Sequence, residues 1–136
     1  MTVSLSEFKP LPEPVIIVED EPLIRILLEE TLEEIGISST TFDNAGSALI
    51  HLKSIDGKCS LIIADHGLPG GIQGIEFIRL AHERWPSIPS ILTSGYSIDK
   101  QELLPATVFL PKPYTLVELE ETITNALRQR HSPPQQ

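Results

Sequence analysis

The stretch LIIAD (residues 61–65) is a run of aliphatic residues that ends abruptly on an acid, and HGLPGG (residues 66–71) follows it. A short aliphatic run bounded by turn residues predicts a buried strand. In a parallel α/β sheet, the residue at the carboxyl end of a strand faces the crevice where ligands bind. We therefore expect Asp65 to lie at a functional site.

A second stretch, VIIV (residues 15–18), repeats this pattern and ends on Glu19 and Asp20. If the two strands are parallel neighbours, three carboxylates gather at one end of the sheet. Two unit charges about 4 Å apart repel by about 1 kcal/mol in water and by about 4 kcal/mol at an effective dielectric constant of about 20. Such a cluster favours a cation, and Mg²⁺ suits hard oxygen ligands that leave room for water.

The composition describes a chain of one-domain size with an aliphatic core. Its 136 residues suffice to bury a core without disulfides or structural metals. Only 5% of the residues are aromatic, so aliphatic side chains must supply most of that core. The single cysteine, Cys59, cannot form an intramolecular disulfide, and we interpret it as a small packed or partly exposed thiol.

The formal net charge of −9 argues against binding to nucleic acid or anionic lipid, because the sequence has no cluster of Lys or Arg to attract phosphate. No apolar segment approaches the roughly 20 residues of a membrane span, and the N-terminus lacks the basic start and apolar core of a signal peptide. We therefore expect no membrane segment and a cytoplasmic location.

Hydrophobic periodicity along the chain predicts five strands that alternate with five helices. The predicted strands are residues 15–18, 37–42, 61–65, 90–93 and 108–110, and the predicted helices are residues 22–35, 45–54, 74–85, 99–104 and 116 to about 127. Parallel strands need helical crossovers, which place helices on both faces of the sheet. The predicted fold class is therefore α/β and doubly wound, with a five-stranded parallel sheet.

The two ends of the chain differ in composition from the part between them. Three prolines at positions 10, 12 and 14 predict a flexible N-terminal arm over residues 1–13. The folded domain is predicted over residues 14–130. Residues 131–136 are polar and contain prolines, so we expect a disordered tail.

Polar side chains stand at the ends of four predicted strands: Glu19 and Asp20, Asp65, Thr93 or Ser94, and Lys112. Each alone has an ordinary structural explanation, because a strand-terminal Asp often caps the next helix and a lone Lys is usually solvated. Together they suit phosphoryl transfer onto a carboxylate, with Asp65 as the candidate nucleophile. Mg²⁺ held by the acids would offset their crowded charge, while Lys112 and a hydroxyl would meet the phosphoryl oxygens.

Other motifs do not match. The glycine-rich segment 67–74 lacks the Gly-Lys-Ser/Thr ending of a phosphate-binding loop and the G-x-G-x-x-G spacing of a dinucleotide site. TSGYS (residues 93–97) is not the G-x-S-x-G nucleophile elbow. His66 is an unfavourable metal ligand beside Asp65, because neighbouring side chains at a strand end point apart.

Four segments in order resemble the receiver domain of two-component response regulators. They are VIIVEDEP (15–22), LIIADHGLP (61–69), LTSGY (92–96) and FLPKPY (109–114), and the resemblance covers roughly residues 14–130. It implies a flavodoxin-like (βα)5 fold with strand order 2-1-3-4-5. Each segment is ordinary alone, but together and in order they form a strong signal.

The resemblance implies a role for each acid at the site. Asp65 would be the phosphoacceptor and a magnesium ligand. Asp20 would bind Mg²⁺ directly and Glu19 would help through water. The third protein ligand would be the backbone carbonyl of Gly67, and Lys112 would pair with the phosphoryl group.

The resemblance also implies how phosphorylation is sensed. Ser94 is the expected switch hydroxyl, with Thr93 as the adjacent alternative, and Phe109 matches the aromatic switch position. The peptide bond between Lys112 and Pro113 is expected to be cis, as receivers have it.

Two features depart from the commonest receiver pattern. The loop after Asp65 is one residue longer and contains Gly70-Gly71, and the stretch between Ser94 and Lys112 is short. The short stretch leaves little room for the predicted helix 99–104. Receivers form their output surface from the fourth helix, the fifth strand and the fifth helix, so this surface is affected as well. Partner-binding geometry is therefore not carried over from the family.

The function implied by the resemblance is that of a stand-alone receiver phosphorylated by a histidine kinase or a histidine phosphotransfer protein. It would signal by binding an unidentified downstream protein or act as a phosphate sink, as a monomer or weak homodimer. We do not expect an enzyme, because its catalysis would be limited to self-phosphorylation and slow self-dephosphorylation.

Three alternatives stay open. The chain could be the receiver domain of a hybrid histidine kinase, or a receiver-like module that has lost phosphorylation. It could also be a Mg²⁺-dependent phosphatase with an aspartyl-phosphate intermediate. Such phosphatases tend to place a second acid two residues after the nucleophile, where this chain has Gly67.

Overall fold

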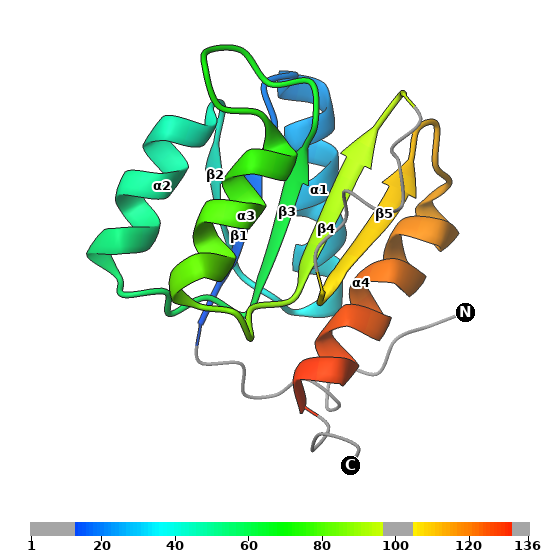
Figure 1. Cartoon of the computed structure of the whole chain (residues 1–136). Coiled ribbons are helices and arrows are strands. Elements are labelled where there is room, and N and C mark those ends of the chain that lie inside the picture. The colour runs from blue at the N-terminus through cyan, green and yellow to red at the C-terminus, as the bar shows by residue number, and fades with distance from the viewer. Residues whose placement is uncertain (1–12, 97–104, 132–136) are drawn as a thin grey trace.

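The computed structural model describes residues 13–96 and 105–131, with side chains described as far as Arg128. One sheet contains five parallel strands in the order β2-β1-β3-β4-β5. Helices α2 and α3 cover one face, and α1 and α4 cover the other (Figure 1). The predicted fold class and strand order are therefore confirmed.

The bounds of the described elements follow the predicted pattern. The strands are β1 (Val15–Val18), β2 (Ser39–Phe42), β3 (Leu61–Asp65), β4 (Ser90–Ser94) and β5 (Thr107–Pro111). The helices are α1 (Pro22–Ile35), α2 (Ala45–Ser54), α3 (Gly74–Arg84) and α4 (Leu116–His131). The predicted helix 99–104, residues 1–12 of the predicted arm and residues 132–136 of the predicted tail lie outside the described residues. His131, predicted as the first residue of the tail, is the last residue of α4.

Strand β2 begins two residues later than predicted. The Gly36 N–H donates to the Glu33 carbonyl, and the Ile37 N–H donates to the Leu32 carbonyl, both at 2.9 Å. These bonds end α1 in a left-handed turn at Gly36 and use the backbone of Ile37 as part of the helix cap. The prediction placed Ile37 in the strand because β-branched residues favour strands. Its backbone N–H instead completes the cap of α1, so the strand begins later.

The register of the sheet aligns the strand ends that carry polar groups. Val18 is the partner of Ala64 across β1 and β3, so Glu19 follows at the level of Asp65. Asp65 is in turn the partner of Thr93 on β4. Parallel pairing thus brings these ends to one edge of the sheet.

Two hydrophobic clusters fill the spaces above and below the sheet. Alternate residues of β1 enter opposite clusters, since Val15 and Ile17 face α1 and α4, while Ile16 and Val18 face α2 and α3. Both β1 and β3 are buried along their whole length, which explains their continuous aliphatic sequences.

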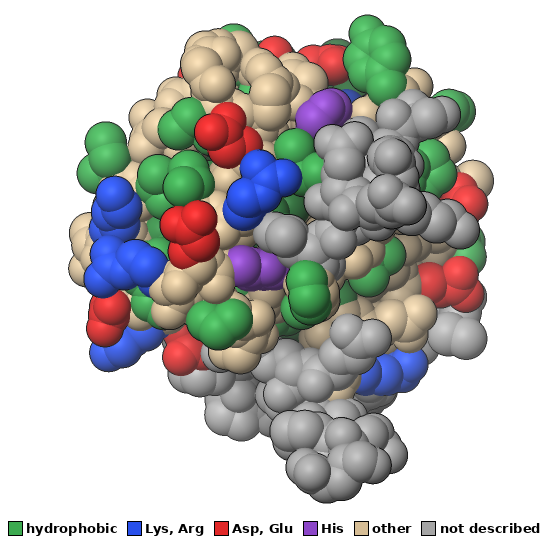
Figure 2. Space-filling model, in the orientation of Figure 1, with side chains coloured by type: hydrophobic (Ala, Val, Ile, Leu, Met, Phe, Trp, Pro, Cys, Tyr) green, Lys and Arg blue, Asp and Glu red, His purple; other side chains and the backbone are tan. Residues whose placement is uncertain are grey.

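The face of the molecule seen in Figure 2 carries no large patch of side chains of one charge sign. Acidic and basic side chains are interspersed over the region of α2 and α3. No helix among the described residues is long and apolar enough to cross a membrane.

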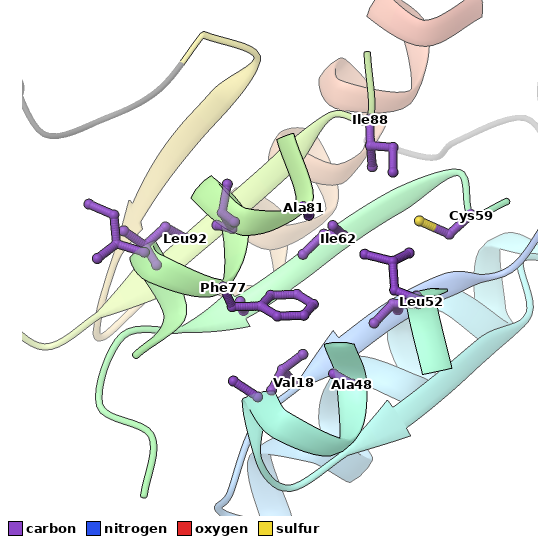
Figure 3. Close-up of a cluster of buried hydrophobic side chains, with 14 of the residues drawn as sticks. Val18, Ala48, Leu52, Cys59, Ile62, Phe77, Ala81, Ile88 and Leu92 are labelled. Atoms are coloured by element: carbon purple, nitrogen blue, oxygen red, sulfur yellow. The ribbon is translucent and has the colours of Figure 1, made fainter. Parts of the chain in front are cut away.

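Phe77 on α3 is a fully buried aromatic side chain in the cluster beneath α2 and α3 (Figure 3). We expect Phe77→Ala to lower the free energy of unfolding by about 3–5 kcal/mol, because it removes buried apolar surface and leaves a cavity. Denaturant unfolding measures this loss. Ile50→Ala is the matched control, since Ile50 is 72% exposed and should change stability by less than about 0.5 kcal/mol.

His82 joins the end of α3 to the start of β4. Its Nε2 donates to the Ile88 carbonyl oxygen at 2.8 Å and lies 3.1 Å from Ser90 Oγ. Burial lowers the pKa of His82 below its usual 6.5, although the hydrogen bond to Ile88 acts in the opposite direction.

The lowered pKa of His82 predicts acid sensitivity. The unfolded chain binds a proton at His82 more tightly than the folded chain does, so this group destabilises the fold as the pH falls through 6.5. As the pH falls, the unfolding free energy of wild type should decrease more than that of His82→Gln, which has no group that titrates at this position. Denaturant unfolding at several pH values tests this, and a difference independent of pH would contradict it.

Candidate functional site

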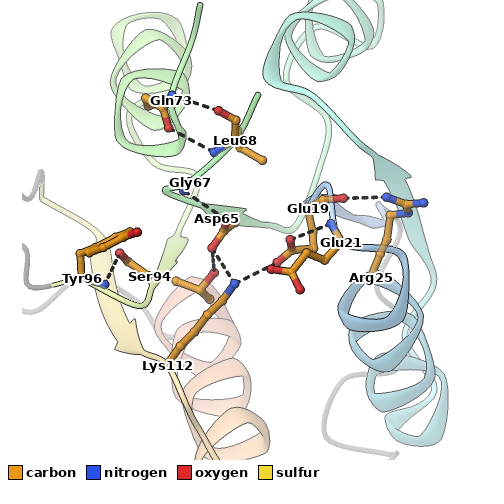
Figure 4. A network of polar contacts seen from close by, with 11 residues as sticks. Glu19, Glu21, Arg25, Asp65, Gly67, Leu68, Gln73, Ser94, Tyr96 and Lys112 are labelled. Carbon is orange, nitrogen blue, oxygen red and sulfur yellow. Dashed lines mark hydrogen bonds and ion pairs between the residues drawn. The ribbon is translucent and has the colours of Figure 1, made fainter. Parts of the chain in front are cut away.

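Asp65 ends β3 at the crevice, and three donors hold its carboxylate (Figure 4). Lys112 Nζ lies 2.9 Å from Asp65 Oδ1, and the Thr93 hydroxyl donates to the same oxygen at 3.1 Å. The Gly67 N–H donates to Oδ2, also at 3.1 Å. With the residue only 6% exposed, Asp65 is a buried carboxylate in a fixed orientation.

Glu19 lies beside Asp65 and shares Lys112 with it. Lys112 Nζ is 3.4 Å from Glu19 Oε1, and Glu19 is 1% exposed. Burial is the main cause that raises the pKa of Glu19 above its usual 4.5; the Glu21 N–H bond lowers it and the charge of Asp65 raises it further. Two acids, Glu19 and Asp65, thus share the one ammonium group of Lys112.

The two neighbouring acids also affect the pKa of Lys112. Burial by itself lowers this pKa, but the hydrogen bonds and negative charges of Asp65 and Glu19 outweigh burial and raise it above its usual 10.5. Lys112 therefore stays charged at neutral pH and serves as the counterion of both acids.

The carboxylates of Glu19, Asp20 and Asp65 form a group that suits a metal ion. One oxygen from each lies within 4.8 Å of the others, and Asp20 is the most exposed of the three. Hard carboxylate oxygens with an open side toward water match the preference of Mg²⁺. The residues brought together are those predicted from the sequence.

The two hydroxyls at the end of β4 make different contacts. Thr93 bonds to Asp65, whereas Ser94 is 2% exposed and its Oγ accepts a hydrogen bond from the Tyr96 N–H at 2.9 Å. Adjacent residues of a strand point to opposite faces, so both cannot meet Asp65 in this conformation. The switch role expected for Ser94 stays a prediction.

The fifth strand brings in the remaining predicted residues. Phe109 is half-buried on β5 and is the register partner of Leu92. The peptide bond between Lys112 and Pro113 is cis, as predicted.

An apolar groove of about 500 Å³ opens next to Lys112. Its lining residues are Ile24, Leu27, Gly95, Lys112, Pro113 and Tyr114. The crevice therefore has an acidic side, formed by the strand ends, and an apolar side, formed by α1 and the loop after β5.

Sequence reasoning missed two residues that hold the loops of the site. Arg25 on α1 donates to the Glu19 carbonyl oxygen at 2.7 Å, and the side chain of Gln73 bonds to both backbone polar groups of Leu68 (Figure 4). Neither shows a motif spacing, because both contacts depend on where a helix lies relative to a loop. Gly74 was predicted only as a helix start, yet a Cβ there would lie 2.2 Å from the Asp65 carbonyl oxygen.

The fold and the site define a doubly wound α/β domain with three carboxylates and a lysine at the carboxyl ends of its strands. The family model for the response regulator receiver domain matches residues 15–124. The chain belongs to this family of two-component signalling domains, whose members bind Mg²⁺ through such an acidic cluster.

Named relatives agree with this family. The chain is 38% identical over 122 residues to the KDP operon transcriptional regulatory protein KdpE of Escherichia coli (strain K12), across 87% of this chain and 52% of KdpE. It is 28% identical over 120 residues to the sensor kinase CckA of Brucella abortus (strain 2308), across 85% of this chain and 13% of CckA. The chain thus spans about half the length of KdpE and less of CckA.

A solved structure supports the fold. The response regulator receiver protein from Sinorhizobium medicae WSM419 superposes with a TM-score of 0.79 at 24% identity, covering 88% of this chain and 98% of that one.

Lys112→Met should destabilise the metal-free protein, because it leaves two buried carboxylates without their counterion. We expect a loss of about 1–3 kcal/mol in unfolding free energy in the presence of a chelator, and recovery of most of it with Mg²⁺. Denaturant unfolding under both conditions measures the effect. The exposed Lys53 supplies the control Lys53→Met, and equal behaviour of the two variants would contradict the assigned role.

Proposed function

We propose that this receiver accepts a phosphoryl group on Asp65 from the phosphohistidine of a histidine kinase or a histidine phosphotransfer protein. The observation that carries the proposal is the Asp65 carboxylate, held by Lys112, Thr93 and Gly67 beside two further acids. This geometry orients one buried oxygen nucleophile, and the family supplies the class of donor.

In the proposed transfer, an Asp65 oxygen attacks phosphorus as the bond from phosphorus to the donor imidazole nitrogen breaks. The nitrogen keeps the bonding electron pair, and Asp65 becomes an acyl phosphate. Lys112, which already contacts Asp65 at 2.9 Å, meets a phosphoryl oxygen.

The metal in this proposal is Mg²⁺, held by Asp20, Asp65 and the carbonyl of Gly67, with Glu19 acting through water. When bound, it supplies positive charge that offsets the phosphoryl group and the crowded acids. Support comes from the chemistry of the donor set, since Glu19, Asp20 and Asp65 all offer hard oxygen atoms within 4.8 Å of one another.

Signalling would start at Ser94. Its hydroxyl now accepts from the Tyr96 N–H, and rotation toward a phosphoryl oxygen on Asp65 would release that bond. Phe109 on the adjacent strand would follow, because β5 pairs directly with β4. Thr93 is the alternative switch hydroxyl, since it already bonds to Asp65.

The proposal extends to the wider function of the domain. We propose that the domain acts in the cytoplasm as a monomer or weak homodimer, without binding nucleic acid or membrane. It passes its signal by binding an unidentified protein, or drains phosphate from a phosphotransfer protein. Its own chemistry is self-phosphorylation and slow self-dephosphorylation.

The receiver domain of a hybrid histidine kinase is the second candidate. The alignment with the sensor kinase CckA favours it, because that protein contains a segment matching 85% of this chain. The chemistry at Asp65 is the same in both candidates.

Wild type should gain about 80 Da, the mass that one phosphoryl group adds, on incubation with Mg²⁺ and acetyl phosphate. Asp65→Asn should gain none, because an amide is a poor nucleophile, and a chelator should abolish the gain in wild type. Intact-mass spectrometry under conditions that preserve acyl phosphates measures this. Asp43→Asn, at an exposed acid before α2, is the matched control and should gain the same mass as wild type.

A phosphatase would behave differently in the same assay. Sustained release of phosphate from phosphomonoesters would overturn the receiver proposal, whereas a single stable modification supports it. Failure of wild type to gain mass despite Mg²⁺ binding would favour a module without phosphorylation.

A further inference from the structure

The loop between β3 and α3 is closed by one side chain. The Gln73 carboxamide accepts from the Leu68 N–H through Oε1 at 3.1 Å, and its Nε2 donates to the Leu68 carbonyl oxygen at 3.0 Å (Figure 4). The amide of Gln73 therefore bonds to both the N–H and the carbonyl of Leu68, in the way that a neighbouring backbone strand would. We call this pair of bonds the Gln73 clamp.

The glycines in the middle of the loop are not held by packing. A Cβ on Gly70 or Gly71 would meet no atom within 4 Å, and both residues are exposed. Two side chains of the loop are packed. Leu68 is 4% exposed and lies in the cluster beneath α2 and α3, and Ile72 packs against that cluster. The conformation of the loop therefore depends on these two side chains, on the Gly67 N–H bond to Asp65 and on the Gln73 clamp.

The Gln73 clamp also determines the orientation of the preceding peptide group. The Leu68 N–H and the Gly67 carbonyl belong to the same planar trans unit, in which the two bonds point in opposite directions. Holding the N–H against Gln73 thus directs the Gly67 carbonyl away from Gln73. The other side of Gly67 is held as well, because its N–H donates to Asp65 Oδ2.

The backbone of Gln73 is held in place close to Asp65. Gln73 is the N-cap residue of α3, and the next residue, Gly74, is so close to β3 that a Cβ would overlap the Asp65 carbonyl oxygen. The amide of Gln73 therefore reaches back to Leu68 from a point fixed relative to Asp65.

We propose that Gln73 is a positioning residue that presents the Gly67 carbonyl to Mg²⁺. The inference rests on the proposed function, in which this carbonyl is the third protein ligand. Gln73 touches neither the metal nor the phosphoryl group; it acts through the Gly67–Leu68 peptide. Groups that orient metal ligands in this way commonly change metal affinity by tenfold or more when they are removed.

The test compares Mg²⁺ affinity by isothermal titration calorimetry in the full chain. Gln73→Met keeps the length of the side chain but removes both hydrogen bonds, and should weaken binding about tenfold. Gln73→Glu keeps an acceptor for the Leu68 N–H, and should bind Mg²⁺ at least as well as wild type. Asn44→Ala is the stability control, because it removes the cap bond to Ser47 at α2 and leaves this loop intact.

Amide hydrogen exchange by NMR gives a readout that needs no metal. In chelated protein, the Leu68 N–H should exchange about tenfold faster in Gln73→Met than in wild type. It should stay protected in Gln73→Glu and in Asn44→Ala. Unchanged protection of this amide in Gln73→Met would overturn the role of the clamp.

The outcomes separate this inference from the proposed function. Wild type that binds no Mg²⁺ overturns the proposed function and the inference with it. Wild-type binding together with undiminished binding by Gln73→Met overturns only the inference. Equal weakening in Gln73→Met and Asn44→Ala overturns it too, because loss of stability alone then accounts for the effect.

Discussion

The ammonium of Lys112 lies between two buried carboxylates, 2.9 Å from Asp65 and 3.4 Å from Glu19. Both acids end central strands of the sheet, where neighbouring helices exclude water and repulsion between like charges is strong. Lys112 offsets part of this repulsion, while burial and then the charge of Asp65 raise the pKa of Glu19. The grouped acids therefore suit a cation at this edge of the sheet.

The parallel sheet makes this arrangement possible. Because β1, β3, β4 and β5 run in the same direction and in register, their carboxyl ends deliver side chains from four distant parts of the chain to one crevice. Close packing at Gly74 lets α3 begin directly against the end of β3. The two hydrophobic clusters stabilise the strands, so the loops at the strand ends can carry the polar residues of the site.

Bonds from side chains to the backbone give these loops their shape. Arg25 holds the carbonyl of Glu19, Gln73 holds Leu68, and Ser94 holds the N–H of Tyr96. Such bonds are individually weak in net terms, about 1 kcal/mol each. The loops of the site are therefore held by a few weak bonds rather than by core packing alone.

The sequence by itself determined the order of the elements, the parallel sheet and the acids of the site, because hydrophobic periodicity and strand-end residues are local patterns. It misplaced the start of β2, where Ile37 completes a helix cap. Only the tertiary structure decided that Thr93 rather than Ser94 contacts Asp65, and that Arg25 and Gln73 hold the loops. These contacts depend on side-chain rotamers and on how helices meet loops, which no spacing along the chain records.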